Sequence, residues 1–133
     1  MTAHDASHIV PLGAICWRML RAVRAMFTGA RLRLPNRRAS ISFGLEVNGL
    51  AYTATYSRFA DGRPAEIFLQ NHRTNSGADV NARDAAIAAS FALQHGANVE
   101  DIRKALCRDN QGRASGPLGV ALDILAGENG DSP

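Results

Sequence analysis

The chain has 133 residues, of which 46% are hydrophobic and 20% are charged, and its net charge is +3. This balance is typical of one globular domain, and the length excludes a second full domain. No apolar run approaches the roughly 20 residues that cross a bilayer, and the first ten residues lack the basic segment and cleavage site of an export signal. These absences predict a cytoplasmic protein without a membrane span.

The two cysteines, Cys16 and Cys107, are far apart in the sequence. No second cysteine or histidine pair stands near either of them, so neither a disulfide framework nor a zinc site is predicted. Both are expected to be buried or half-buried thiols. The sequence leaves any cofactor unknown and predicts no metal site.

Charge is unevenly distributed along the chain. Residues 1–39 carry seven arginines and one acid, a net charge of +6, whereas residues 40–133 carry a net charge of −3. This difference predicts a basic arm over residues 1–38, a domain over 39–126 and a frayed tail over 127–133. The arginines of the arm are Arg18, Arg21, Arg24, Arg31, Arg33, Arg37 and Arg38.

Within the arm, residues 14–28 have the period of an amphipathic helix. Its apolar side consists of Ile15, Cys16, Met19, Leu20, Val23, Met26 and Phe27, and its arginines lie opposite. Such a helix can follow nucleic-acid phosphates, lie on an anionic membrane, or pack its apolar side on the domain or a partner. Residues 31–38 follow as an extended linker around Pro35, with arginines that face solvent.

From Ala39 the hydrophobic period changes to two, which predicts strands. Asn48-Gly49 favours a two-residue hairpin, and Asp61-Gly62 favours a second turn before a third strand over residues 64–70. Both turns place apolar residues on one buried face. The predicted pairs are Val47 with Leu50, Leu45 with Tyr52, Phe43 with Ala54, Ile41 with Tyr56, Tyr56 with Ile67, and Ala54 with Leu69.

The opposite face of this predicted sheet is polar, with Phe68 as its one aromatic side chain. An exposed aromatic residue can stack a nucleic-acid base, and it can equally lie under the amphipathic helix or at a subunit contact. The strands at 40–47 and 64–70 would be sheet edges, and either could pair with a second copy to give a homodimer.

Three helices are predicted after the sheet. Ser76 caps a helix over residues 77–95 that ends before Gly96, and a shorter helix spans 98–107. Pro117 begins a last helix, which gives the order β-β-β-α-α-α and an α+β fold: a three-stranded antiparallel meander packed on three C-terminal helices. The side chains of the first helix predicted to face the core are Val80, Ala85, Ile87, Ala88, Phe91 and Ala92.

The loops before two of these helices offer backbone N–H groups that anions favour. Serine and glycine are also common in ordinary helix caps, so the pattern fits a plain cap as well. No phosphate-binding glycine motif is present, and no catalytic residues are predicted, because His72 and His95 have no partner at a fixed spacing. The candidate anion or nucleotide ligands are Arg63, Arg73, Ser76, Gly77, Ser115 and Gly116.

Several short phrases together resemble the TSCPD domain, over about residues 33–126. They are Arg33-Leu34-Pro35-Asn36-Arg37-Arg38, Tyr52-Thr53-Ala54-Thr55, Asp61-Gly62-Arg63, Glu66-Ile67-Phe68-Leu69, Leu93-Gln94-His95-Gly96 and Ser115-Gly116-Pro117-Leu118-Gly119. That domain ends the cobalamin-dependent class II ribonucleotide reductases and also occurs as a small free-standing protein of bacteria and prophages. The Thr-Ser-Cys-Pro-Asp segment that names the family is absent here, so no redox or metal role is carried over.

The resemblance implies an accessory or regulatory domain linked to class II ribonucleotide reductase and deoxyribonucleotide synthesis. It would bind a nucleotide or a reductase subunit and would not itself be the catalyst, because the large barrel and its cysteines are missing. The alternative is a phage or bacterial interaction protein that binds nucleic acid or an acidic protein partner through the basic arm. Salt-sensitive binding that needs residues 1–38 would distinguish the second function from the first.

Overall fold

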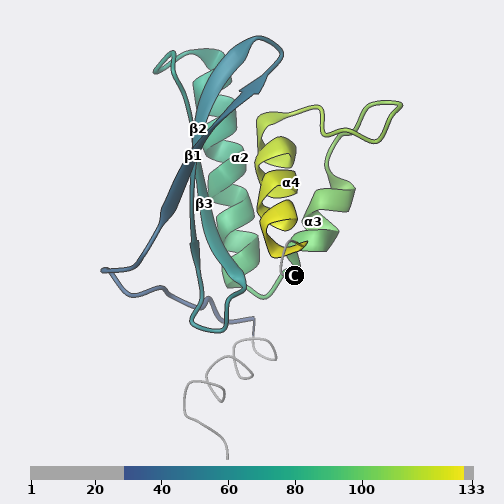
Figure 1. Cartoon of the computed structure of the whole chain (residues 1–133). Coiled ribbons are helices and arrows are strands. Elements are labelled where there is room, and N and C mark those ends of the chain that lie inside the picture. Colours follow the sequence, from purple (N-terminus) through teal and green to yellow (C-terminus); the bar gives the residue numbers. More distant parts are fainter. Residues whose placement is uncertain (1–28, 131–133) are drawn as a thin grey trace, which may run out of the picture.

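The computed structural model describes residues 29–130, with side chains as far as Glu128. It confirms the α+β fold, with the elements in the order β1-β2-β3-α2-α3-α4 and the strands side by side in that same order. Figure 1 shows α2 and α4 on one side of the sheet, with α3 beyond α4. The predicted helix over 14–28, with Cys16, Arg18, Arg21 and Arg24, lies outside the described residues. The elements are β1 (Ile41–Val47), β2 (Leu50–Arg58), β3 (Pro64–Asn71), α2 (Gly77–Gln94), α3 (Val99–Ala105) and α4 (Pro117–Gly130).

The strand register is the predicted one at every pair. Asn48 and Gly49 have φ angles of 52° and 77°, which a type I′ hairpin requires at its two central residues. β3 extends one residue beyond the predicted end, to Asn71. The pairs are Val47 with Leu50, Leu45 with Tyr52, Phe43 with Ala54, Ile41 with Tyr56, Tyr56 with Ile67, and Ala54 with Leu69.

The core lies between the sheet and the helices α2 and α4. Its largest fully buried apolar side chains are Tyr56, Ile67, Leu122 and Leu125. Two residues of the face predicted to be buried are exposed instead, Ile41 at 54% and Leu50 at 37%. Both residues begin their strands, and their side chains lie at the margin of the helical layer.

Helix α2 presents to the sheet a different side from the one predicted. Val80, Ile87 and Phe91 are 44–46% exposed, whereas the alanines at 82, 86 and 89 are buried. The prediction that the large side chains face the core was therefore wrong. Small side chains face the sheet because α2 lies close against β3, where alanine lets the two backbones approach and larger groups would not fit.

Three polar side chains on the inner side of α2 close the outer edge of β3. The Ser90 hydroxyl accepts from the Ile67 N–H and donates to the Ile67 carbonyl, each over 2.9 Å. The Gln94 amide donates to the Ala65 carbonyl over 3.2 Å, and the buried Asp79 carboxylate accepts from the Asn71 N–H over 2.9 Å. The Ala65 carbonyl, both Ile67 groups and the Asn71 N–H, which an edge strand would offer to a second chain, are thus already bonded. The predicted pairing of the strand at 64–70 with another copy is blocked at these positions.

Both ends of the described chain are attached to the domain. The Leu32 N–H donates to the Gln94 carbonyl over 2.8 Å, and Arg38 forms a two-point ion pair with Glu66 that raises the pKa of Arg38. Arg38 therefore does not simply face solvent, as the linker prediction had it. At the other end, α4 continues through residues 127–130, and the Tyr56 hydroxyl donates to Glu128 over 2.6 Å. Burial, followed by this bond, raises the pKa of Tyr56.

Candidate ligand-binding cavity

Two hollows flank α4, and they differ in whether the polar groups that line them are already bonded. The larger, about 790 Å³, runs along the β1–β2 hairpin and the loop over residues 109–115. Its charged side chains are largely paired, Asp109 with Arg113 and Asp123 with arginines of α3 and the following loop. The smaller, about 380 Å³, lies between the first turns of α2 and α4 and is mainly apolar. The smaller cavity is the candidate site, because backbone N–H groups that line it have no acceptor among the described residues.

The smaller cavity is built where two helices begin. Ala78, Asn81 and Ala82 line it from the start of α2, and Gly116, Leu118 and Gly119 line it from the start of α4. Tyr52 forms part of the wall from β2, and Leu106 and Cys107 close it from the loop after α3. The fold thus brings together two helix N-termini that are 40 residues apart in the sequence. N-termini of helices favour anions, because their first N–H groups are unbonded and the helix dipole is positive there.

The start of α2 is closed by its own side chains. The Ser76 hydroxyl accepts from the Asp79 N–H over 3.2 Å and donates to the Arg73 carbonyl over 2.7 Å. The Asp79 carboxylate accepts from the Asn71 and Asn75 N–H groups over 2.9 and 3.0 Å. A buried carboxylate in the first turn offsets the positive end of the dipole. The start of α2 therefore attracts an anion less than an uncapped helix start would.

The start of α4 has no such closure. Its first turn holds no acidic residue, and the position before it is Gly116, which has no side chain to accept a bond. The Val120 N–H bonds to the Gly116 carbonyl, but within residues 29–130 no acceptor is bonded to the N–H of Leu118 or Gly119. Both residues are buried and line the cavity. Two backbone donors are therefore left without partners at the positive end of a helix.

One buried polar atom next to a wall residue of the cavity has no hydrogen-bond partner. Tyr52 lines the cavity, and its partner across the strands is Asn71, which is 2% exposed. The Asn71 amide nitrogen is buried and has no partner among the described residues. Unsatisfied buried polar atoms are rare in folded proteins. Tyr52, Leu118 and Gly119 line the cavity itself, whereas Asn71 does not.

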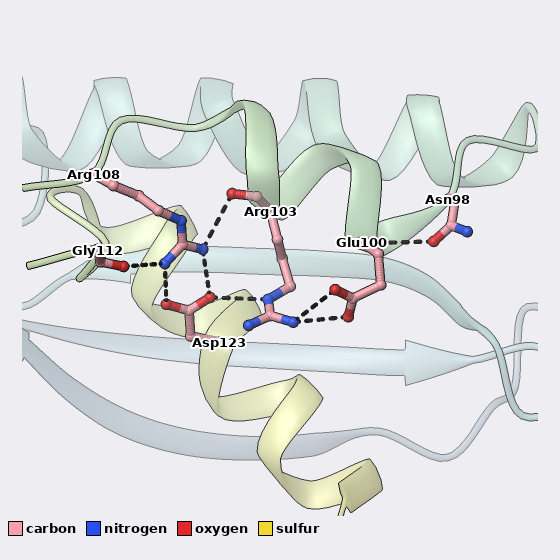
Figure 2. A network of polar contacts seen from close by, with 6 residues as sticks. All are labelled: Asn98, Glu100, Arg103, Arg108, Gly112 and Asp123. Carbon is pink, nitrogen blue, oxygen red and sulfur yellow. Dashed lines mark hydrogen bonds and ion pairs between the residues drawn. The ribbon is translucent and has the colours of Figure 1, made fainter.

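The loop that closes the cavity is held by a cluster of ion pairs, which Figure 2 shows. Arg108 donates to both oxygens of Asp123 over 2.8 and 2.9 Å, and Arg103 donates to the same carboxylate over 2.9 Å. Arg103 also bonds Glu100, and Arg108 bonds the Gly112 carbonyl. The bonds from Arg108, and secondarily from Arg103, lower the pKa of Asp123. This cluster fixes α3 and residues 106–116 to α4, and so sets the shape of the cavity.

Gly119, in the first turn of α4, lies in close contact with Ala114 in the loop before the helix. A Cβ atom at this position would lie 2.9 Å from the Ala114 Cβ, a distance that real side chains do not reach. Glycine therefore lets the loop pass directly over the first turn of the helix.

Cys107 lies on the same loop and is an exposed free thiol, which corrects the expectation that it is buried. The position of Cys16 lies outside the described residues.

The structure separates the residues predicted as anion ligands. Gly116 lines the cavity, whereas Ser115 lies in the larger hollow on the other side of the loop. Ser76 and Gly77 stand just before the cavity-lining Ala78, and Ser76 is occupied as a helix cap. Arg73 is exposed in the loop before α2, and its guanidinium forms no bond with a described residue. Arg63 lies in the β2–β3 turn, at the far end of the sheet, where it pairs with Asp61.

Sequence reasoning did not find Tyr52, Asn71, Leu118 or Gly119 as parts of a site. Tyr52 and Asn71 had been interpreted only through the sheet pattern, and neither residue type marks a ligand by itself. A usable signal was present at α4, because a glycine at the cap supplies no capping side chain and a proline as the first helical residue supplies no N–H. That absence distinguishes α4 from the Ser76 and Asn98 starts of α2 and α3.

The remaining predicted groups lie apart from the cavity. Arg33 and Arg37 are exposed, and within the described residues neither forms an ion pair. His72 bonds the Thr53 hydroxyl over 3.1 Å on the open face of the sheet, and the His95 ring bonds the Phe91 carbonyl over 2.8 Å. Among residues 29–130, no three His, Cys, Asp or Glu side chains are grouped as metal ligands would be, and no helix there is long and apolar enough to cross a membrane.

Comparisons with family models, with curated proteins and with solved structures give no match for this chain. The geometry of the cavity is therefore the basis for the function proposed next.

Proposed function

We propose that this protein is a non-catalytic binding domain that takes a small anionic ligand with an apolar body in the cavity between α2 and α4. A nucleotide belongs to this class, because it combines a phosphate with a flat, largely apolar base. The volume of about 380 Å³ is within the range of small-molecule sites. A ligand of this kind would place its anionic group at the start of α4 and its body against the alanines of α2.

The observation that carries this proposal is the difference between the two helix starts. Both α2 and α4 begin at one cavity, and only α2 has a capping side chain. An anion at α4 would accept from the Leu118 and Gly119 N–H groups, as phosphates do at other helix N-termini. Tyr52 lines the same cavity, and its hydroxyl would offer a further hydrogen-bond donor to a sugar or base there.

The resemblance to the TSCPD domain gives this ligand site a biological setting, as a proposal. In that setting the protein is an accessory or regulatory partner of a class II ribonucleotide reductase, and the ligand is a ribo- or deoxyribonucleotide whose level reports on deoxyribonucleotide synthesis. The domain would respond to the nucleotide and contact a reductase subunit. Arg73 is exposed in the loop just before α2, and in this proposal its guanidinium would meet a second phosphate.

The decisive test replaces Gly116 with a residue that caps α4. Open space surrounds Gly116, and its backbone is not in the left-handed region, so Gly116→Asp and Gly116→Ser both fit. Either side chain would accept from the unbonded N–H groups and raise the free energy of unfolding by about 0.3 kcal/mol, because glycine is itself a tolerated cap. Calorimetric titration with nucleoside mono-, di- and triphosphates and with inorganic phosphate measures binding to each variant.

The expected result is that Gly116→Asp removes nucleotide binding, because its carboxylate occupies and repels the anion position. Gly116→Ser, which adds a cap without charge, should weaken binding about tenfold by competing for the same donors. Arg73→Glu should weaken triphosphates more than monophosphates. Unchanged binding in Gly116→Asp, with its stability raised, would overturn the site. A native protein that binds none of the nucleotides or phosphate would overturn the function.

A second candidate function rests on the arm. Arg33 and Arg37 are exposed and have no acidic partner among the described residues, so they are available to phosphates of nucleic acid or to an acidic protein. Deleting residues 1–38 would also remove the Arg38–Glu66 pair, so a charge variant is the cleaner test. Arg33→Glu with Arg37→Glu should abolish salt-sensitive DNA binding if the arm has this function. DNA binding that persists in this variant, or that resists high salt, would contradict it.

A further inference from the structure

The outer side of α2 carries an apolar stripe that the described residues leave nearly half exposed. Val80, Ile87 and Phe91 follow the helical repeat along this side, and they are 45%, 46% and 44% exposed. Phe68, from the open face of β3, lies at 47% exposure beside them. Between Phe68 and Ile87 the surface is hollowed by about 380 Å³. We call Val80, Ile87 and Phe91 the α2 stripe.

The chain enters the described part of the structure at one end of this stripe. The Arg31 guanidinium lies 4.1 Å from the centre of the Phe91 ring, and its Nε donates to Gln94 over 2.5 Å. The Leu32 N–H is bonded to the Gln94 carbonyl. Residues 14–28 are therefore tethered within a few residues of Phe91. A tether this short gives the segment a high effective concentration at the stripe.

We infer that residues 14–28 of the same chain pack along the α2 stripe as an amphipathic helix parallel to α2. The lengths agree, because Val80 to Phe91 and Cys16 to Phe27 each cover eleven steps, about 16 Å at the rise of an α-helix. With Phe27 held near Phe91 by the tether, Leu20 and Val23 reach Ile87 and its hollow, and Cys16 reaches Val80. The arginines at 18, 21 and 24 then face away from α2.

This assignment accounts for a stripe that would otherwise be hard to understand. Three large apolar side chains aligned on one exposed helix side mark a contact surface. A second copy could cover the stripe, but it would have to displace a segment of matching length and apolar pattern that is already attached at Phe91. The inference is independent of the ligand site, because the stripe and the cavity lie on different sides of α2.

The native Cys16 allows a direct test in the full-length chain. In a Cys107→Ser background, Val80→Cys places a second thiol at the end of the stripe that Cys16 should reach. Mild oxidation should then give an intramolecular disulfide, measured by thiol titration and by the mass of peptide pairs. Val80 is exposed, so its replacement leaves the core intact.

Two matched variants control the position of the cysteine. Phe91→Cys lies on the stripe but about 16 Å from the expected place of Cys16, and Asp101→Cys is exposed on α3, away from the stripe. Intramolecular crosslinking by Val80→Cys should exceed that of both controls by roughly tenfold. Equal crosslinking in all three variants would overturn the inference. Disulfide-linked dimers from Val80→Cys would also overturn it, and would assign the stripe to a second copy instead.

Discussion

Helices α2 and α4 begin beside the same cavity, but only α2 has a side chain that accepts a hydrogen bond from an N–H group of its first turn. At α2, Ser76 and Asp79 accept bonds from the surrounding backbone and hold the preceding loop in place. At α4, a glycine precedes the helix and a proline begins it, and no side chain accepts from the first turn. The comparison shows that one helix start is closed by its own side chains, while the other leaves backbone donors without a partner among the described residues.

The largest expected effect comes from opening the start of α2. Asp79→Ala would leave the buried Asn71 N–H and the Asn75 N–H without acceptors, and should lower the free energy of unfolding by about 3 kcal/mol. Urea unfolding followed by circular dichroism measures the loss. Asp84→Ala, on the exposed side of the same helix, is the control and should change stability by less than about 0.5 kcal/mol. Similar losses in the two variants would contradict the role of Asp79.

The close contact at the start of α4 gives the next largest effect. Gly119→Ala would push its Cβ against Ala114 and should cost about 1–3 kcal/mol, with a loss of ligand binding as the first turn moves. Gly127→Ala, in open space on the same helix, should instead stabilise by about 0.5–1 kcal/mol, because alanine is the better helix former. A lower unfolding temperature for Gly119→Ala and a higher one for Gly127→Ala would confirm that packing requires glycine at position 119. A stabilised Gly119→Ala would contradict it.

Replacing the serine before each helix compares the two starts directly. Ser76→Ala removes a cap and should cost about 1 kcal/mol. Ser115→Ala should change stability by less than about 0.5 kcal/mol, because the Ser115 hydroxyl bonds none of the described residues. Chemical denaturation of the two variants side by side is the measurement. Equal losses would mean that α4 is capped after all.

The smallest expected effect is on the pH dependence of the cluster in Figure 2. Arg108 and Arg103 lower the pKa of Asp123 below its ordinary value of 3.8 in the folded state, so folded protein binds fewer protons than unfolded protein. The stabilisation by Asp123 is therefore complete above about pH 4 and is lost as the pH falls through the lowered pKa. Because these side chains are partly exposed, the change should be modest.

Thermal unfolding of the native protein and of Asp123→Asn across this range measures that contribution. The two midpoints should differ at neutral pH and converge as the pH falls below 3.8. A difference that stays constant into acid would show that the asparagine acts through packing and not through the lost charge.

The sheet could be predicted from the sequence because its signals are local. Asn48-Gly49 fixes the first hairpin, and an error of one residue would have moved every apolar side chain to the wrong face. The side of α2 that faces the sheet could not be predicted in the same way. Hydrophobic periodicity favours burying Val80, Ile87 and Phe91, but the free edge of β3 needs the small alanines and the polar Ser90 close to it. That requirement depends on a neighbour in space and not on the helix itself.

The candidate site was predictable only in part. Gly116 was found because helix starts have a sequence signature, and Arg63 was included although it lies at the other end of the sheet. Tyr52 becomes relevant only when the fold places it beside the start of α4, and Asn71 only when the strand register places it opposite Tyr52. Such convergence of distant segments follows from the fold, and no single stretch of the sequence contains it.

The polar inner side of α2 also limits how these domains can assemble. With the Ala65 carbonyl, both Ile67 backbone groups and the Asn71 N–H bonded to side chains of α2, the outer edge of β3 offers fewer groups to another strand than β1 does. Two molecules joined through β1 would form a continuous sheet of double width, with α2 along each outer margin. Growth beyond that pair would require α2 to move away from β3, so the domain resists extension into a fibril.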